Sequence, residues 1–433
     1  MPPRHLSSHQ TKAIKNGNSP FEWIQKRGHV TGLLSRDGGD LVFNYGRSYL
    51  ERDNRIPIYE PELPLVPGIQ HPGPGLQLPS CIRDAAPDAW GRRVIINRRF
   101  GAKRDDIDIN QPDELTYLLK SGSDRIGALD FQASPTEYVA REPSETSLEE
   151  LLAAADRVQR GMPLTPRLGR ALFYGSSIGG ARPKALIVEG DQKHIAKFSA
   201  QSDVFNVVKS EFVAMRLAMR IGLNVAPVRL VQAAGKDVLL IERFDRPRVG
   251  GGWARKAMVS ALTIFGLEEM MARYASYEEL CARIRHGFTA PEATLRELYA
   301  RLVFNILVGN TDDHARNHAA FWDGRMLELT PAYDICPQSR VGNEASQAML
   351  IVGSERMSQL AVCRRAAAKF LLTPAQGDEI IELQLRTIRA SWAEICDEGE
   401  LGEVDRNGMW GRQILNPYAF EDLPDILKRA ADA

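Results

Sequence analysis

The sequence changes character near residue 250, where segments typical of strands and turns give way to segments typical of helices. Before this point, His29 to Tyr45 predicts a hairpin around the turn Asp37-Gly38-Gly39, and residues 204–221 predict a long amphipathic helix. Beyond it, apolar residues recur mostly at helical spacing. A chain that separates its strands from its helices in this way favours an α+β fold.

Composition divides the chain into further parts. Residues 1–20 are polar and basic and predict a disordered leader, and a polar segment over 133–147 predicts a linker. A methionine cluster over 269–271 is predicted to lie in the core. The predicted parts are a leader over 1–20, a β-rich N-terminal subdomain over 21–135, a lobe with an antiparallel sheet over 136–247 and a helical lobe over 248–433.

The charge and cysteine content exclude several classes of protein. Lys plus Arg and Asp plus Glu both number 55, so a global basic field for nucleic acid is absent. The five cysteines are scattered and never spaced as C-x-x-C, which argues against a disulfide framework or a structural zinc site. No apolar run is long enough to predict a membrane span, and residues 1–20 lack the apolar core of a signal peptide. We therefore expect a cytoplasmic protein in a reducing compartment.

The segment that points most directly to chemistry reads GNTDDHARNHAAF and is followed by LTPAYDICP. Asp312 and Asn317 have the D-x-x-x-x-N spacing of a kinase catalytic loop, and Asp334 follows a strand-like stretch. Phosphoryl transfer needs a carboxylate that orients the attacking hydroxyl and hard oxygen ligands that hold Mg²⁺ against phosphates. We therefore predict Asp312 as the catalytic carboxylate and Asn317 and Asp334 as magnesium ligands. Alone, Asp312 and Asp313 could instead cap a helix.

Other parts of a nucleotide site precede this segment in the expected order. A Gly-rich turn, GSSIGGARPK, would let backbone N–H groups approach phosphate, although it lacks the Lys-Ser/Thr of a Walker A loop. Lys197 follows on a strand-like run, and Glu211 lies on the next helix, where it would pair with Lys197. A solvated lysine and a plain surface carboxylate are the alternatives. The run LLIERF then resembles a hinge that would bind adenine, which makes residues 136–247 the predicted nucleotide-binding lobe.

Together these stretches resemble the HipA family, the serine/threonine kinase toxins of bacterial type II toxin–antitoxin modules. The matching runs are SSIGGARPKALI, HIAKF, LLIERFDR, ILVGNTDDHARNHAAF and LTPAYDICP. GRSYLER, PDAWGRRVI and DRIGALDFQ are similar to the N-terminal unit of the family. The resemblance implies a two-lobed, protein kinase-like α+β fold with an additional β-rich N-terminal subdomain and a mostly helical C-terminal lobe. It also implies ATP and Mg²⁺ as cofactors.

The resemblance implies a role for each site residue. Asp312 would be the catalytic aspartate, Asn317 and Asp334 would bind Mg²⁺, and Lys197 would bind the ATP phosphates. Further contacts to ATP are implied for Ser177, Ile178, Gly179, Gly180, Glu242, Phe244 and His314. His314 could instead support the loop without touching ATP.

The resemblance also implies self-modification. Ser177 matches the serine that family members phosphorylate on their own phosphate-binding loop, and the added charge would eject the loop and inactivate the kinase. Ser176 lies next to it, so both serines remain candidates.

Partners and substrate follow from the resemblance as well. Family members phosphorylate aminoacyl-tRNA synthetases and are held by a small helix-turn-helix antitoxin that binds operator DNA. We therefore expect a HipB-like antitoxin, a synthetase substrate, DNA contact mainly through the antitoxin complex, and no membrane partner. Two other interpretations stay open: a small-molecule kinase of the aminoglycoside or choline kinase type, and a catalytically silent kinase fold that acts as a corepressor.

Overall fold

The computed structural model describes most of the chain. The described residues are 12–16, 29–100, 112–141, 146–165, 167–169, 172, 182–200, 203 and 205–432. They divide into two compact units. The first unit comprises Met1–Ile187, Asp245–Val259 and Trp322–Arg325, and the second comprises Val188–Phe244, Ser260–Phe321 and Met326–Ala433. Units made of separate segments do not mark domain ends along the chain, so the predicted boundaries at residues 20, 135 and 247 stay predictions.

The first unit is built around a five-stranded sheet in the order β4-β3-β2-β1-β5. Its strands are β1 (Lys12–Asn16), β2 (His29–Asp37), β3 (Asp40–Tyr45), β4 (Ile69–Gln70) and β5 (Leu129–Gln132). β2 and β3 pair antiparallel up to Asp37 and Asp40, and Gly38 takes the positive φ of 56° in the turn between them. The prediction of a hairpin is therefore confirmed.

The strand β1 lies within the segment that the sequence predicted as a disordered leader. It pairs antiparallel with β2 on one side and with β5 on the other, so its backbone groups find partners in both neighbours. For these five residues the structure differs from the prediction, because pairing between distant segments leaves no pattern in a short polar stretch. The other residues of the predicted leader lie outside the described part of the chain.

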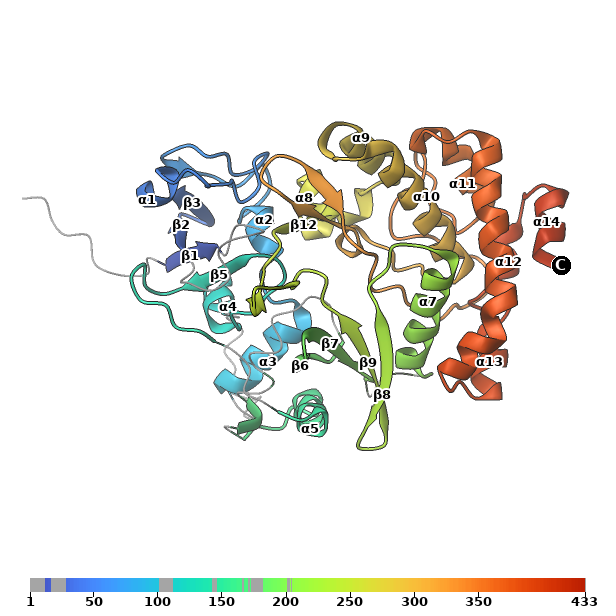
Figure 1. Cartoon of the computed structure of the whole chain (residues 1–433), viewed down its shortest axis with the longest axis horizontal. Helices are drawn as coiled ribbons and strands as arrows, with labels where there is room; N and C mark the ends of the chain where they lie inside the picture. Colours follow the sequence, from blue (N-terminus) through green and yellow to red (C-terminus); the bar gives the residue numbers. More distant parts are fainter. Residues whose placement is uncertain are drawn as a thin grey trace, which may run out of the picture. The chain divides into compact units, whose positions relative to one another are not determined.

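The described part of the first unit also contains helices, labelled in Figure 1, and a short hairpin. The helices are α1 (Arg47–Leu50), α2 (Ser80–Arg83), α3 (Ala89–Phe100), α4 (Glu114–Lys120) and α5 (Leu148–Gln159). The hairpin pairs β10 (Arg248–Val249) with β11 (Gly252–Trp253). Asp113 is the N-cap residue of α4, and its side chain accepts a hydrogen bond from Thr116 N at 2.8 Å. Such a cap satisfies one of the backbone N–H groups that a helix start leaves without a partner.

A buried carboxylate on β5, Asp130, forms ion pairs with two arginines of the first unit. Asp130 lies 2.7 Å from Arg141 and 3.6 Å from Arg125, and its side chain is almost completely buried. Burial alone would raise the pKa of Asp130, but the neighbouring arginines outweigh it and lower the pKa below its usual range. Asp130 is therefore held as an ion inside the unit.

The ERFDR motif contributes to the same unit. Asp245 accepts a hydrogen bond from Gly127 N at 2.9 Å and pairs with Arg246 at 2.8 Å. Arg246 also pairs with Asp124 at 2.8 Å. Both motif residues are buried, so they fix the loop that leads into β5. Asp245 and Arg246 therefore have a structural role in this motif.

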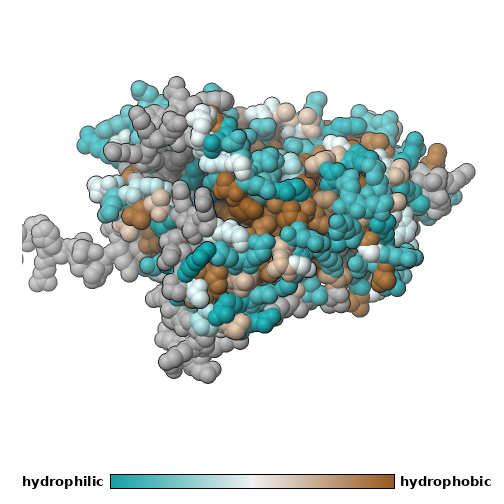
Figure 2. Space-filling view, turned by 60° about the horizontal axis from the view of Figure 1, so that its bottom comes forward, coloured by the Kyte–Doolittle hydropathy of each residue, from teal (hydrophilic) through white to brown (hydrophobic). Residues whose placement is uncertain are grey.

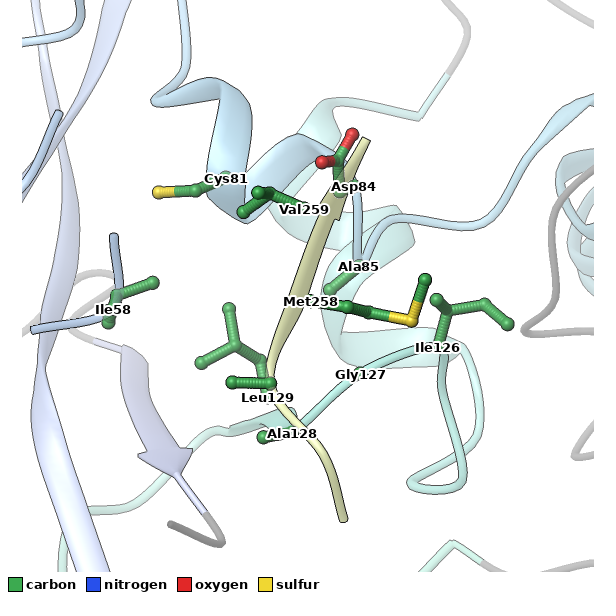
Figure 3. Close-up of a pocket in the computed structure, with 11 residues that line it drawn as sticks. Ile58, Cys81, Asp84, Ala85, Ile126, Gly127, Ala128, Leu129, Met258 and Val259 are labelled. Carbon is green, nitrogen blue, oxygen red and sulfur yellow. The ribbon is translucent and has the colours of Figure 1, made fainter. Parts of the chain in front are cut away.

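A small pocket in the first unit is lined mainly by apolar side chains. Ile58, Cys81, Leu129 and Met258 surround it, together with the carboxylate of Asp84 (Figure 3). Burial and the neighbouring Glu62 raise the pKa of the Cys81 thiol well above its usual value, which keeps the thiol neutral. A mostly apolar lining with one carboxylate does not suit a triphosphate.

The second unit contains an antiparallel sheet with a helix packed on it. β9 (Lys236–Glu242) lies between β7 (Gln192–Phe198) and β8 (Val228–Ala233). The division between the units falls inside β6 (Lys184–Glu189). The helix predicted over 204–221 is α7 (Val207–Ile221), which ends at Gly222 in the left-handed conformation.

The remaining elements of the second unit are mostly helices. They are α8 (Ala261–Phe265), α9 (Tyr277–Gly287), α10 (Pro291–Leu307), α11 (Leu360–Ala366), α12 (Pro374–Glu398), α13 (Glu403–Met409) and α14 (Asp425–Asp432). Four 3₁₀ helices join them: η1 (Glu269–Tyr274), η2 (Ala315–Asn317), η3 (Ala367–Phe370) and η4 (Pro417–Phe420). The short strands of this unit are β13 (Ala319–Trp322) up to Phe321 and β14 (Leu327–Leu329), whereas β12 (Met258–Ser260) belongs to the first unit up to Val259.

Two ion pairs join α7 to the long helix α12, and the two helices lie side by side in Figure 1. Arg216 lies 2.8 Å from Glu398, and Arg220 lies 2.7 Å from Glu394. Since α7 also packs on the sheet, these contacts connect the sheet to the helical part of the same unit.

The methionine cluster is on the surface, which corrects the prediction that it is core. Met270 is 81% exposed and Met271 is 44% exposed, and no residue of η1 is buried. The physical reason is that η1 is a six-residue 3₁₀ helix between α8 and α9, too short to turn a complete face inward.

The described residues on the face seen in Figure 2 are largely polar. Hydrophilic residues cover most of the described area in Figure 2, and hydrophobic residues gather in one part of that view. No helix in the described part of the chain combines the length and the hydropathy that a membrane span requires.

Candidate active site

Lys197 and Glu211 form an ion pair within the second unit. Lys197 lies on β7 and Glu211 on α7, and Lys197 Nζ is 2.6 Å from Glu211 Oε1. Both side chains are largely buried, with 11% and 3% exposed. Lys197 Nζ also contacts the carboxylate of Asp334, which lies 137 positions further along the chain. The structure therefore brings together three of the predicted site residues.

Charge balance keeps Lys197 a cation. Burial alone would lower the pKa of Lys197, but the carboxylates of Asp334 and Glu211 outweigh it and raise the pKa above its usual value. A fixed ammonium group at this position suits the binding of phosphate oxygens.

The loop that carries Asp312 begins with a required glycine. Gly309 follows α10 with a φ of 68°, and a Cβ at this position would come within 2.6 Å of Gln413 O. Any side chain here would therefore strain the backbone and meet another backbone segment. Further on, Asn317 Nδ2 donates to Asp312 O at 3.0 Å. The two residues of the D-x-x-x-x-N pattern thus hold one another within a single loop.

The electrostatics of this loop disfavour the charge on Asp312. Partial burial raises the pKa of Asp312, and the nearby negative charges of Asp334 and Asp313 raise it further, while His314 acts in the opposite direction. Asp312 is exposed to solvent. A reachable carboxylate with a raised pKa is suited to accepting a proton from a hydroxyl group.

Asp334 occupies an unusual backbone conformation. Its φ is 61°, in the left-handed region that residues other than glycine rarely adopt. The preceding residues are tied down: Ala332 N donates to Asn224 O at 2.8 Å, and Tyr333 OH donates to Arg316 O at 2.7 Å. Such conformations persist where surrounding contacts enforce them, and they gather at functional sites.

A buried network surrounds Asp313, next to the predicted catalytic residue Asp312, and the sequence analysis missed it. The carboxylate of Asp313 accepts a hydrogen bond from Tyr277 OH and lies 2.9 Å from His318 Nε2. Burial would raise the pKa of Asp313, but His318, Tyr277 and Asn305 stabilise the charge and lower it. Asp313 is thus a fixed ion that positions its neighbour Asp312. The second Asp of the TDDH run was the visible pattern, but its partner Tyr277 is far away in sequence.

The predicted hinge lies beside the segment that carries Asp334. The ring of Phe244 lies 5.8 Å from the ring of Phe321 and 5.8 Å from that of Tyr333, which precedes Asp334. At the end of β9, Glu242 N donates to Pro227 O at 2.9 Å. The backbone N–H of Glu242 is therefore already used within the sheet and is not available to adenine.

Further contacts to ATP were predicted in the Gly-rich turn. Ser176, Ser177, Ile178, Gly179 and Gly180 of the Gly-rich turn lie outside the described residues.

His314 is described. Its backbone N–H donates to Asp312 O at 2.9 Å. The buried ring atom Nδ1 of His314 has no hydrogen-bond partner among the described residues. A buried ring nitrogen without a partner fits a contact to a bound polar ligand.

The oxygen ligands available here fit a magnesium ion that arrives with phosphates. Asp334 offers a carboxylate, and Asn317 offers its amide oxygen, since its Nδ2 is engaged with Asp312. Among the described residues, no group of three or more His, Cys, Asp or Glu could hold a metal by itself. Mg²⁺ typically takes one or two protein oxygens and completes its shell with substrate phosphates and water. The residues present therefore fit Mg²⁺ bound to a nucleotide.

Comparison with known families identifies the chain. Residues 176–392 match the HipA-like C-terminal domain, and residues 24–132 match the HipA N-terminal domain. The chain belongs to the HipA family. The family predicted from the sequence is therefore confirmed.

Related proteins support a kinase as the class of protein. A Sinorhizobium fredii protein named "Putative kinase Y4mE" is 24% identical over 332 residues, which cover 71% of this chain and 75% of that protein. "Serine/threonine-protein kinase toxin HipA" of Shewanella oneidensis is 28% identical over 186 residues, or 37% of this chain and 42% of the relative.

A solved structure confirms the fold. HipA of Shewanella oneidensis MR-1, solved as a complex of HipA, HipB and operator DNA, matches with a TM-score of 0.67 at 18% identity. The match covers 98% of this chain and 100% of the other. The predicted α+β, kinase-like fold class is thus confirmed.

Proposed function

We propose that this HipA-family protein is an ATP- and Mg²⁺-dependent serine/threonine protein kinase. The observation that carries the proposal is the contact of Lys197 with both Glu211 and Asp334, in the same unit as the Asp312–Asn317 loop. A buried lysine paired with a helix carboxylate and a metal-binding aspartate is the arrangement that phosphoryl transfer from ATP requires.

Each residue has a separable role in this proposal. Bound Mg·ATP would supply the phosphoryl group and neutralise part of the phosphate charge. Lys197 would bind phosphate oxygens, and Asn317 and Asp334 would hold the metal. Asp312 would orient the acceptor hydroxyl and accept its proton, for which a raised pKa is favourable. The ion at Asp313 would keep Asp312 in place.

The proposal extends to a toxin that modifies itself. We propose that Ser177 or Ser176 is the site of self-phosphorylation, as the family resemblance implies. We further propose a HipB-like antitoxin as the partner, DNA contact mainly through that complex, and an aminoacyl-tRNA synthetase as the substrate in the cytoplasm. The antitoxin is supported by the HipB found with the structural relative from Shewanella oneidensis.

Phosphorylation of the chain itself tests the proposal. Purified protein incubated with ATP and Mg²⁺ should gain a phosphate on Ser176 or Ser177, detected by mass spectrometry of proteolytic fragments. Asp312→Asn should abolish the gain, and excess EDTA should do the same in the wild type. Asp397→Asn is a matched control, because Asp397 is an exposed carboxylate of the same unit outside the site. Phosphorylation that persists in Asp312→Asn would reject the role given to Asp312.

A further inference from the structure

The 3₁₀ helix η1 exposes a dense set of large side chains. Met270, Met271 and Tyr274 are 81%, 44% and 51% exposed, and the guanidinium of Arg273 lies 5.0 Å from the centre of the Tyr274 ring. We call Met270, Met271, Arg273 and Tyr274 the methionine ledge. Single exposed apolar side chains are common, but three within five residues form a patch of the kind that binds partners.

The methionine ledge is tied to the catalytic loop. Glu269, the first residue of η1, lies 2.9 Å from Arg316, which stands between Asp312 and Asn317 in sequence. The backbone oxygen of Arg316 accepts the hydrogen bond from Tyr333, next to Asp334. Two consecutive contacts therefore connect Glu269, the residue before the ledge, to the loop that would hold the acceptor hydroxyl and to the neighbour of the proposed metal ligand Asp334.

The segment that follows Asp334 reaches the ledge from another direction. Arg356 donates to Arg273 O at 2.6 Å, and Leu350 N donates to Ala275 O at 2.9 Å, directly after η1. Within the same segment, Ala348 N donates to Thr311 O at 3.1 Å, next to Asp312. The ledge, the catalytic loop and this segment are thus joined pairwise by described contacts.

We infer that the methionine ledge binds the polypeptide segment that carries the acceptor hydroxyl, through an apolar side chain a few residues from the Ser or Thr. The inference rests on the proposed kinase function and names what recognises its protein substrate. An extended chain advances about 3.3 Å per residue, so a ledge whose preceding residue Glu269 contacts the loop at Arg316 is reached within a few residues of the acceptor.

The residue types of the ledge favour binding of an apolar side chain of the substrate. Methionine adapts to partners of different shape, and Met, Tyr and Arg are enriched where proteins bind each other. Met270 and Met271 are the apolar side chains that the ledge exposes, while Glu269 is paired with Arg316 and Arg273 lies over the Tyr274 ring.

A positional peptide library tests the inference in the full-length protein. Peptides with one central Ser or Thr carry Leu, Met, Lys or Glu at each flanking position, and kcat/KM is measured for each together with the KM for ATP. The variant is Met270→Glu/Met271→Glu. The matched control is Leu383→Glu/Val404→Glu, which changes two side chains of the same unit that are 58% and 85% exposed, on α12 and α13.

The expected result is specific to the acceptor. The wild type and the control should prefer Leu or Met over Glu at one flanking position by about tenfold, a typical discrimination for an apolar contact. Met270→Glu/Met271→Glu should lose this preference and favour Lys at that position, while the KM for ATP and the thermal midpoint stay unchanged.

Failure of the inference and failure of the proposed function give different results. A protein that phosphorylates neither itself nor any peptide contradicts the proposed function. A protein that phosphorylates itself, but shows no apolar preference or accepts no library peptide, overturns the ledge alone. A variant with unchanged peptide preference but altered self-association or antitoxin binding also overturns it, because the ledge would then hold a different partner.

Discussion

Replacing Lys197 by Met should separate what this residue does for the fold from what it does for catalysis. The substitution keeps a similar volume but leaves Glu211, whose side chain is 3% exposed, without its lysine. Breaking a buried ion pair by removing one partner costs about 3–5 kcal/mol. Asp334 is 39% exposed, so loss of its contact with Lys197 adds about 0–1 kcal/mol at most.

The consequence for stability is measurable by thermal unfolding. A loss of about 3–5 kcal/mol should lower the thermal midpoint by about 6–20 °C for a unit of this size. Adding Glu211→Leu should recover most of this loss, because an apolar pair replaces the buried carboxylate that has lost its lysine.

Activity should respond differently to the same changes. Phosphoryl transfer should fall by about 10²–10³-fold in Lys197→Met, the usual effect of removing one fixed charge from a transition state. The double variant with Glu211→Leu should be stable and still inactive. Lys209→Met is the matched control, since Lys209 is equally buried, at 12% exposed, and pairs with Asp237 outside the site. Phosphate transfer by Lys197→Met within tenfold of the wild type would refute this account, as would a double variant no more stable than the single one.

Two further substitutions test the scaffold. Gly309→Ala should lower stability by about 1–2 kcal/mol from the left-handed conformation alone, and more from the approach to Gln413 O, measured as the midpoint of urea unfolding. Asp130 should give an acid-dependent stability in the first unit. Its pKa is lowered in the folded state, so its stabilising effect is complete above the ordinary Asp range and is lost as the pH falls below about 4. Asp130→Asn should therefore flatten the thermal midpoint against pH in this window and lower the midpoint at pH 7.

Local patterns explain which parts of the structure the sequence could predict. The β2–β3 hairpin follows from alternating apolar residues around a Gly-rich turn, and α7 follows from apolar spacing along one face. Lys197 and Glu211 could be paired in advance because each lies on an element whose type and order were recognisable. These predictions depend on neighbours along the chain, which the sequence displays directly.

Contacts between distant segments could not be predicted in the same way. The hydrogen bond from Tyr277 to Asp313 joins positions 36 apart, and neither residue type signals the other. β1 is a strand because of its two neighbours, not because of its own residues. Met270 shows a related limit: an apolar side chain indicates a preference for burial, but the packing of η1 decides whether that preference is met.

The crowding of negative charge around Asp312 predicts a trade-off between stability and function. Partial burial raises the pKa of Asp312, and Asp334 and Asp313 raise it further against the opposing effect of His314, so the fold disfavours its charge at neutral pH. A carboxylate whose pKa is raised on folding destabilises the folded state above its unfolded pKa, so Asp312→Asn should raise the thermal midpoint at pH 7 while abolishing phosphoryl transfer. The difference in midpoint should shrink as the pH falls through the raised pKa of Asp312, because the wild-type side chain then takes up a proton. Equal midpoints at pH 7 would show that the surrounding charges are already neutralised in solution, and the raised pKa could then no longer be used to explain why Asp312 serves as the base.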